Sequence, residues 1–384
     1  MRVLMISKAL VAGTSQRKLE ELAKCPDVEL TLVTPPYWKS DDGSKQTLER
    51  LYTSGYRMIV TPMALNGNFH LHYYPQLGQI MREVQPEVVH IDEEPYNLAT
   101  YQAMRLAMRQ KASALFFTWQ NLYRRYPPPF RQFELHNYRH AAAAIAGNRD
   151  ASEVLRRKGY QGPVHIIPQF GFDTEIYRRS EPRPPRSAND PFTLGFIGRL
   201  KEEKGLSLIV EALTFLPACC QAVFIGNGPM KSVLEEQVAR LGVGERVIFK
   251  PGVPTYAVPR EMERLNVFVL PSLSRPNWIE QFGRVLPEAM SCETPVIGSS
   301  SGEIPYVIGD AGLVFQEGDA RALSECVRKL LDNPELYADL ARRGRQRVID
   351  HYTQERIAHQ TYEVYLKMVE ASPDPVRQKA NEKV

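Results

Sequence analysis

Two glutamates stand eight positions apart in the stretch EQFGRVLPE, and their spacing suggests that one ligand could contact both. The apolar periodicity after the first of them, Glu280, predicts a helix that begins at Phe282 or Gly283 and passes through the second, Glu288. Eight residues span about 12 Å in a helix. That separation resembles the distance from a sugar ring to a ribose across a diphosphate, so Glu280 would accept hydrogen bonds from sugar hydroxyls and Glu288 from ribose hydroxyls.

The start of the predicted helix could bind the phosphates of the same ligand. The first turn of a helix has free N–H groups and the positive end of the helix dipole, and both favour a diphosphate. Phe282, Gly283 and Arg284 lie at this start and are candidate binding residues. The spacing does not favour a glycosidase, whose two carboxyls lie about 5 to 9.5 Å apart. The alternative is a loop glutamate and a solvated helix glutamate with no shared role.

A second group of candidates follows an earlier strand, in GRLKEEKG. Arg199 and Lys204 offer a planar guanidinium and a flexible ammonium, a combination that suits a diphosphate, although both side chains could simply be solvated. Gly198 precedes Arg199, and Gly226 opens the similar stretch GNGPM after the next strand. Glycine at such positions either lets the backbone approach a ligand closely or makes a tight turn.

Buried strands are expected to position these residues, because apolar β-rich runs alternate with amphipathic segments of helix length. The runs lie at 2–7, 28–33, 87–92, 114–119, 143–147 and 164–168 in the first half, and at 193–198, 222–226, 246–250, 266–272, 294–299 and 311–315 in the second. Such apolar strands with helices between them predict parallel sheets covered on both faces. Ligands of these sheets bind beyond the carboxyl ends of the strands.

The alternation is interrupted once, by the charged and proline-rich segment 178–191. We therefore expect an α/β protein with two Rossmann-like, doubly wound parallel-sheet domains that face each other across a cleft, the GT-B architecture. The expected parts are an N-terminal Rossmann-like domain at 1–180, a linker at 181–191 and a C-terminal Rossmann-like domain at 192–355. A C-terminal helix that packs back on the N-terminal domain, and a tail, would occupy 356–384.

Composition favours a cytoplasmic protein without disulfides. The five cysteines have no C-x-x-C spacing, which fits free thiols in a reducing compartment. The start MRVLMISKALVAG lacks the apolar core of a signal peptide, and no run approaches the roughly 20 apolar residues of a membrane span. Residues 1–180 carry 23 basic and 17 acidic side chains. This excess fits an anionic acceptor or a peripheral contact with the inner face of an anionic membrane, or an ordinary solvated surface.

Together the motifs resemble the retaining glycosyltransferases of family 4. The resemblance rests on E-x7-E from Glu280 to Glu288, on the G-R…K-G pair of Arg199 and Lys204, on G-x-G-P at 226–229 and on TPVIGSSSGEIPYVIGDAGLVF at 294–315. It is dense over residues 193–316, which look like the donor-binding half of these enzymes, so it implies a donor-binding domain at 192–355 and an acceptor-binding domain at 1–180. It is thinner in the first half, where QPEVVHIDEEP and VHIIPQFGFDTEIY are similar to the family.

The resemblance implies transfer of a sugar from a UDP- or GDP-linked donor to a hydroxyl of a glycan, lipid or small-molecule acceptor, with retention at the anomeric carbon. It implies no cofactor and no obligatory metal, and the chain has no D-x-D triplet. Arg199, Lys204 and the helix N-terminus would stabilise the leaving diphosphate, and Glu280 would position the donor. No protein nucleophile is implied, because the leaving phosphate itself would help to deprotonate the acceptor.

The first half departs from the family pattern. Relatives often carry a Gly-Gly pair in the first loop, where this chain has Gly13 alone as a candidate for donor binding. Many relatives have a histidine where Gln120 stands, and glutamine cannot act as a general base near neutral pH, so it would only orient substrate. The candidates on the acceptor side are Glu93, Glu94, Trp119, Gln120 and Asn121. Core packing is the alternative for Trp119, and a solvated helix start is the alternative for the two glutamates.

Two other functions would use the same donor site. A nucleotide-sugar epimerase of GT-B-like fold would need an acid and a base near the sugar ring, and Glu280 is the one evident candidate. A non-catalytic nucleotide-sugar binding protein would not need Glu280, Arg199 and Lys204 together. Nucleic acid is not an expected partner, because the basic residues form no stripe with stacking aromatics. The loop NLYRRYPPPFRQF at 121–133 could touch lipid headgroups, or be an ordinary proline-ordered loop.

Overall fold

The chain forms two compact units. The computed structural model describes residues 1–40, 43–183, 187 and 190–371. The first unit combines residues 1–171 with the helix that begins at Gln354, and the second comprises Phe172–Thr353. The tail expected beyond residue 371 lies outside the described residues, as do residues 184–186, 188 and 189 of the expected linker.

The division after residue 171 comes ahead of the expected linker at 181–191, and the described start of that segment is attached to the second unit. The Arg183 guanidinium donates to the Glu263 carbonyl at 3.3 Å. Just before it, the Ser180 hydroxyl donates to the Glu263 carboxylate at 2.7 Å. Prolines remove the helical and strand periodicity from this segment, but its polar side chains still bind the domain beside it.

The first unit contains, within its described residues, a seven-stranded parallel sheet. Its strands, in spatial order, are β5 (Arg57–Val60), β2 (Glu29–Thr34), β1 (Arg2–Ile6), β6 (Val88–Ile91), β7 (Ser113–Thr118), β8 (Ala143–Ala146) and β9 (Val164–Ile166). A short antiparallel hairpin of β3 (Tyr37–Lys39) and β4 (Lys45–Thr47) stands apart from it. The central strands are apolar on both sides because helices cover both faces.

Alternate residues of each strand point to opposite faces of the sheet, and a different set of helices packs on each face. Leu115 and Phe117 of β7 pack on one face with α1 (Arg17–Ala23) and α13 (Gln354–Glu370). Ala114 and Phe116 face the other side. That side is covered by α2 (Leu77–Val84), α3 (Leu98–Arg109), α4 (Phe130–His140) and α5 (Arg149–Arg157).

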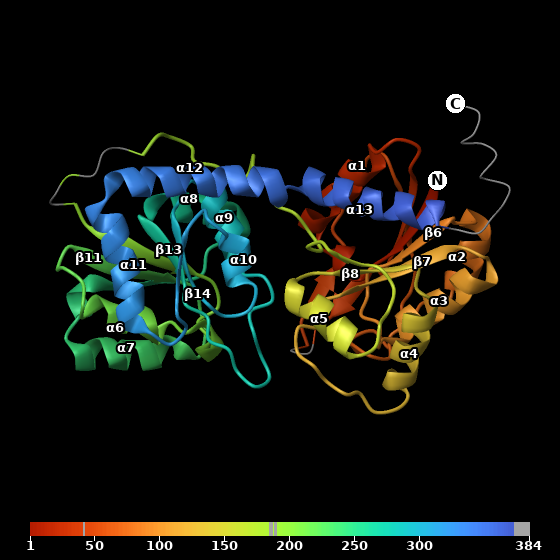
Figure 1. Ribbon diagram of the computed structural model, residues 1–384, viewed down its shortest axis with the longest axis horizontal. Coiled ribbons are helices and arrows are strands. Elements are labelled where there is room, and N and C mark those ends of the chain that lie inside the picture. The colour runs from red at the N-terminus through yellow and green to blue at the C-terminus, as the bar shows by residue number, and fades with distance from the viewer. Residues whose placement is uncertain (41–42, 184–186, 188–189, 372–384) are drawn as a thin grey trace. The chain divides into compact units, whose positions relative to one another are not determined.

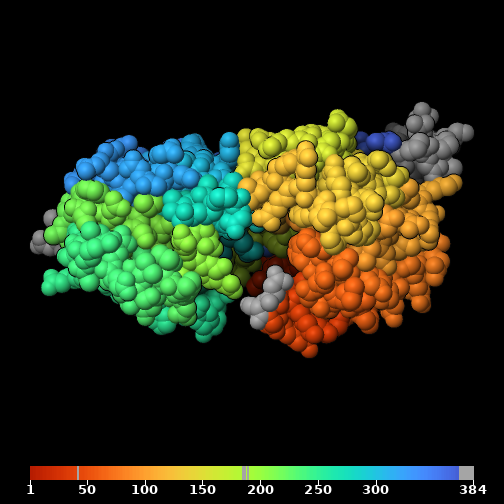
Figure 2. Space-filling view, turned by 90° about the horizontal axis from the view of Figure 1, so that it is seen from below, coloured from red at the N-terminus to blue at the C-terminus, as the bar shows by residue number. Residues whose placement is uncertain are grey.

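The last helix of the chain, α13, is part of the first unit. It is drawn in blue and lies with the red-to-yellow residues of this unit in Figures 1 and 2. Its Tyr365 is buried, and the Tyr365 hydroxyl lies 2.6 Å from Nδ1 of the buried His90 on β6. The C-terminal helix therefore completes the core of the N-terminal sheet.

The second unit is also built on a parallel sheet, of six strands in the described residues. In spatial order they are β12 (Val247–Lys250), β11 (Cys220–Ile225), β10 (Phe192–Ile197), β13 (Val267–Leu270), β14 (Val296–Ser299) and β15 (Leu313–Phe315). Two groups of helices accompany it (Figure 1). One consists of α6 (Ser207–Leu213), α7 (Met230–Leu241) and α11 (Ala320–Asp332), and the other of α8 (Val258–Arg264), α9 (Val285–Ser291), α10 (Ile304–Ile308) and α12 (Pro334–His351).

The expected α/β class with two Rossmann-like sheets is confirmed, and every expected strand is found within two residues of its expected bounds. β5 was not expected, because its short run RMIV lies at the edge of the sheet and is only partly buried. No helix among the described residues is both long and apolar enough to cross a membrane.

Candidate functional site

The carboxyl ends of β10 and β11 bring two glycine loops together in the second unit. Ile197 pairs with Ile225, so Gly198 and Gly226 lie side by side directly after the strands. A Cβ on Gly226 would lie 1.9 Å from the Gly198 carbonyl oxygen, and the φ of Gly226 is +147°. Glycine is therefore required here by backbone contact between the two loops. Arg199 follows and is exposed, and its guanidinium forms no hydrogen bond or ion pair with the described residues.

Glu280 lies at the carboxyl edge of the same sheet, with one carboxylate oxygen already occupied. Lys204, in the short 3₁₀ turn after β10, donates from Nζ to Oε2 of Glu280 at 2.6 Å. The Ser272 hydroxyl, just after β13, donates to the same oxygen at 3.0 Å. Glu280 is 7% exposed, and no described residue hydrogen-bonds to its Oε1. The arrangement leaves one oxygen of a fixed carboxylate able to accept a hydrogen bond from a ligand.

Trp278 restricts the Lys204 ammonium from another side. The Nζ of Lys204 lies 4.9 Å from the centre of the Trp278 ring, a distance at which a cation is attracted to the aromatic face. The Trp278 loop is also tied to the Lys204 turn by an ion pair of 2.8 Å between Arg275 and Glu202. Ser272 and Trp278 thus help to position Lys204 and Glu280. Their places in the sequence, just after β13 and two residues before Glu280, are the features from which these roles could have been predicted.

The expected helix start at Phe282 or Gly283 is wrong, because α9 begins at Val285 with Arg284 as its N-cap. Gly283 has a φ of +75°, which an α-helix does not allow. Phe282 is 7% exposed and stacks on Phe172 with ring centres 6.2 Å apart, so its side chain packs within the second unit. Arg284 is exposed beside the Phe172 ring.

Glu288 faces a different environment from Glu280. It lies in α9, where the Tyr177 hydroxyl forms a hydrogen bond with its carboxyl group. Burial raises the pKa of Glu288 to about 7, and Arg284 and the Tyr177 hydrogen bond offset only part of this effect. Glu288 is therefore a weaker acid than an ordinary exposed glutamate, and it titrates nearer to neutral pH.

In the first unit, the expected loop glycine is covered. The backbone N–H of Gly13 donates to Oε2 of Glu49 at 2.8 Å. A Cβ at this position would lie 2.6 Å from the Leu51 side chain. Gly13 thus lies after β1, but the segment around Glu49 covers it and accepts its N–H hydrogen bond in this structure.

Glu93 and Glu94 are both buried at the carboxyl end of β6, so a solvated helix start does not describe them. Lys8 pairs with Glu93, and His72 Nε2 lies 3.5 Å from the same carboxylate. Although burial opposes ionisation, Lys8 and His72 lower the pKa of Glu93 to about 2. Burial raises the pKa of Glu94 to about 7, despite hydrogen bonds from the Thr118 hydroxyl (2.6 Å) and the Trp119 N–H (2.8 Å).

The residues after β7 are held by partners far away in the sequence. The Trp119 ring packs against Gly147, and its Nε1 donates to Oε1 of Gln169 at 2.9 Å. Gln120 accepts a hydrogen bond of 2.8 Å from Lys158. Asn121 follows and is half-buried. Sequence reasoning missed Lys8 and Lys158, of which Lys8 carried the detectable signal of lying just after a strand.

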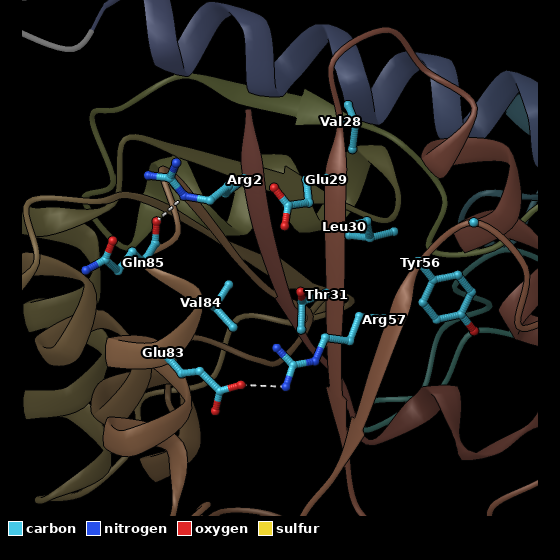
Figure 3. Close-up of a pocket in the computed structure, with 11 residues that line it drawn as sticks. Arg2, Val28, Glu29, Leu30, Thr31, Tyr56, Arg57, Glu83, Val84 and Gln85 are labelled. Carbon is cyan, nitrogen blue, oxygen red and sulfur yellow. Dashed lines mark hydrogen bonds and ion pairs between the residues drawn. The ribbon is translucent and has the colours of Figure 1, made fainter.

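In each unit, the described residues line a cavity at the amino ends of the strands, at the opposite end from the candidate site. The cavity in the first unit has a volume of about 750 Å³ and is lined by Arg2, Glu29 and Arg57, which begin or adjoin the amino ends of β1, β2 and β5 (Figure 3). The one in the second unit, of about 720 Å³, borders the amino end of β10 at Phe192. Because ligands of parallel sheets bind at the carboxyl ends, neither cavity belongs to the candidate site.

Comparison with known proteins covers both units. Residues 17–175 match the family model Glycosyltransferase Family 4, and residues 178–347 match the model Glycosyl transferases group 1. Alpha-maltose-1-phosphate synthase of Mycolicibacterium smegmatis is 30% identical over 59% of this chain and 62% of that protein. N-acetyl-alpha-D-glucosaminyl L-malate synthase of Bacillus anthracis is 28% identical over 44% of each chain. These matches span about two fifths to three fifths of the relatives' lengths.

Solved structures share the fold over nearly the whole chain. HepE of Anabaena, crystallised in complex with UDP, has a TM-score of 0.68 at 16% identity, and the match covers 96% of this chain and 100% of that one. Sucrose-phosphate synthase of Thermosynechococcus elongatus has a TM-score of 0.67 at 20% identity, over 97% and 100% of the two chains. At these identities the likeness establishes the fold alone.

Proposed function

Since the chain belongs to glycosyltransferase family 4 and has the GT-B fold, we propose that it transfers a sugar from a nucleoside-diphosphate donor to an acceptor hydroxyl, with retention at the anomeric carbon and without an obligatory metal. The observation that carries this proposal is the contact of Lys204 and Ser272 with a single oxygen of Glu280. It leaves Oε1 available to a sugar hydroxyl. The Arg199 guanidinium, five residues before Lys204, has no hydrogen-bond or ion-pair partner in the part of the chain that the structure describes.

The proposed reaction divides the work between these groups. Glu280 fixes the donor sugar, and the Arg199 guanidinium and the Lys204 ammonium stabilise the negative charge on the departing diphosphate. The acceptor oxygen bonds to the anomeric carbon as the bond to the diphosphate breaks, and the acceptor proton passes to a departing phosphate oxygen. The Lys204 ammonium has three protons and uses one on Glu280, so it can donate to the diphosphate while it keeps that contact.

Candidate substrates are suggested by the relatives. Structures of the fold neighbour HepE contain UDP and UDP-glucose, and one relative is named as GDP-mannose-dependent. Two other relatives are named as synthases, one of alpha-maltose 1-phosphate and one of N-acetyl-alpha-D-glucosaminyl L-malate. We place the reaction in the cytoplasm, with a small-molecule, glycan or lipid acceptor.

The test combines ligand binding with turnover. UDP, GDP, ADP and their glucose, N-acetylglucosamine and mannose derivatives are screened by thermal shift, because a ligand that binds the native state raises the midpoint. The sugar donor that stabilises most is then incubated with L-malate, glucose 1-phosphate and 2-deoxystreptamine. Acceptor-dependent release of the nucleoside diphosphate supports a transferase. Conversion of the sugar without release would indicate an epimerase, and binding without turnover would indicate a binding protein.

Donor affinity should depend on pH through Glu288. Its carboxylate accepts hydrogen bonds from ribose hydroxyls in this proposal, and a pKa of about 7 means that it is protonated at pH 6 and ionised at pH 8. We expect the nucleotide sugar to bind up to about 10-fold more weakly at pH 6 than at pH 8, the ratio for a single group with a pKa of about 7 whose ionised form alone binds the ligand. Isothermal titration calorimetry with the sugar donor avoids the terminal phosphate ionisation of a free nucleoside diphosphate.

Two matched variants identify the group responsible. Glu288→Gln should remove the pH dependence, whereas Glu94→Gln, which alters another carboxyl group with a pKa of about 7, should retain it. A pH dependence that survives in Glu288→Gln would contradict the assignment of Glu288 to the ribose.

A further inference from the structure

Gln120 is a buried amide whose orientation is fixed by a charge. It lies two residues beyond β7 and is 9% exposed. Its backbone N–H donates to the Thr118 hydroxyl at 3.1 Å, and its Oε1 accepts from Nζ of Lys158 at 2.8 Å. An ammonium group has protons but no lone pair, so the amide oxygen must face Lys158 and the NH₂ group must point away.

Lys158 is itself held in place. It follows α5, is 6% exposed, and donates to Oε1 of Glu134 on α4 at 2.5 Å. The Tyr138 hydroxyl donates to the same Glu134 oxygen at 3.1 Å, and Arg131 donates to the other at 2.6 Å. Glu134 is fully buried, so Lys158 has a fixed anionic partner behind it. A buried ion pair of this kind is costly to desolvate and well suited to specifying one geometry.

The Gln120 NH₂ group retains hydrogen-bonding capacity. Its one neighbour among the described residues is the Tyr126 hydroxyl, at 3.4 Å, near the limit for a hydrogen bond. An amide NH₂ has two protons, so at least one remains available. Thr118, Glu94 and Lys158 all lie around this carboxyl end of the sheet, where ligands of parallel sheets bind.

We propose that Lys158, supported by Glu134, is a positioning residue that holds Gln120 as a hydrogen-bond donor to an oxygen of a substrate. This inference rests on the proposed glycosyltransferase function. The ligand chemistry is an accepting oxygen, either of the transferred sugar or of the acceptor molecule. With its carbonyl oxygen facing Lys158, Gln120 presents no acceptor to the ligand, so a substrate group that can only donate is not recognised there.

A purely structural role for the cluster makes the opposite prediction. If the cluster only ties α4 and α5 to β7, a carboxylate in place of the Gln120 amide would strengthen the contact with Lys158 and leave activity intact. If Gln120 donates to substrate, the same change replaces a donor with a second acceptor. Gln120→Glu therefore separates the two roles, because it nearly preserves the shape of the side chain.

The experiment measures kcat and KM in two arms, both with the nucleotide sugar that wild type uses. One arm follows hydrolysis of the donor by water, and the other follows transfer to L-malate, glucose 1-phosphate or 2-deoxystreptamine. We expect Gln120→Glu to lower kcat/KM at least 30-fold without a fall in thermal midpoint. Loss in both arms assigns the oxygen to the transferred sugar, and loss in transfer alone assigns it to the acceptor.

Variants of Lys158 test the positioning role. Because Lys158→Met alone leaves Glu134 without its ammonium partner, the double variant Lys158→Met/Glu134→Gln removes both charges and keeps the test independent of misfolding. It should lower kcat/KM about 10-fold, the effect of losing one oriented hydrogen bond. Lys158→Arg should recover activity to within 3-fold of wild type, and Arg157→Met, which changes the exposed neighbour, should have no effect.

The outcomes distinguish this inference from the proposed function. Gln120→Glu with both activities within 3-fold of wild type overturns the inference while the transferase function stands. Equal activity of the Lys158→Arg variant and the Lys158→Met/Glu134→Gln double variant would also reject the positioning role. If wild type releases nucleoside diphosphate from no nucleotide sugar in either arm, the proposed function fails and the role of Gln120 fails with it.

Discussion

Replacing Lys204 with methionine is expected to lower the kcat of sugar transfer by about two to three orders of magnitude, the usual effect of removing a group that stabilises transition-state charge. Methionine nearly preserves the length of the side chain and its apolar contact with Trp278 but removes the ammonium. The charge that develops on the diphosphate as the sugar leaves would then rest on Arg199 alone. Because this charge is larger in the transition state than in the bound donor, we expect kcat to fall more than KM rises. Steady-state kinetics with the donor found in the ligand screen measure both constants.

The control for Lys204 is three residues away. Lys201 is partly exposed and lies 3.7 Å from Glu203, so Lys201→Met changes the net charge by the same amount without altering the Glu280 contact. It should leave kcat within 3-fold of wild type. Lys204→Met also removes a partner of the buried Glu280, so its thermal midpoint is compared with that of Lys204→Met/Glu280→Gln. Turnover of a folded Lys204→Met protein at the wild-type rate would exclude Lys204 from catalysis.

The strands could be predicted from sequence because a strand that is buried on both faces is a continuous apolar run. An apolar run such as RVLMI contains the information needed to identify β1, whatever lies elsewhere in the chain. Residues in the loops that follow such runs, including Arg199 and Lys204, could likewise be assigned to the carboxyl edge of a sheet. Their roles at that edge stay predictions until they are tested by substitution.

Contacts between elements that are far apart in the sequence could not be predicted, because no local sequence pattern indicates them. Nothing near Gln120 indicates that Lys158, 38 residues later, fixes its amide, because the contact depends on where α5 ends against β7. The same holds for Tyr365 and His90, which are 275 residues apart. For α9 a local signal existed, since Gly283 between Phe282 and Arg284 could mark a turn before the helix as well as its first residue.

The two carboxylates of the E-x7-E pattern, Glu280 and Glu288, lie in surroundings with different properties. Glu280 is held by Lys204 and Ser272, whereas the pKa of Glu288 is raised to about 7 by burial. A group that must position a sugar benefits from rigid partners, and a group near its pKa at pH 7 makes ligand affinity sensitive to pH. The two glutamates of the motif therefore differ in chemical behaviour, although the motif pairs them.

Glu280→Gln is expected to lower kcat at least about 100-fold while the Kd of the free nucleoside diphosphate changes less than 3-fold. The substitution keeps the shape of the side chain, and the amide oxygen can still accept from Lys204 and Ser272. The amide nitrogen then takes the place of Oε1, so a hydrogen-bond donor faces the sugar hydroxyl that Glu280 would have bound. Misplacement of the sugar relative to the diphosphate should slow transfer strongly, because the reaction depends on near-attack geometry. Glu236→Gln is the matched control, since Glu236 is exposed on α7 and takes no part in the contacts of Lys204 or Glu280. If Glu280→Gln weakens binding of the free nucleoside diphosphate as much as that of the sugar donor, Glu280 supports the fold of the site and does not hold the sugar.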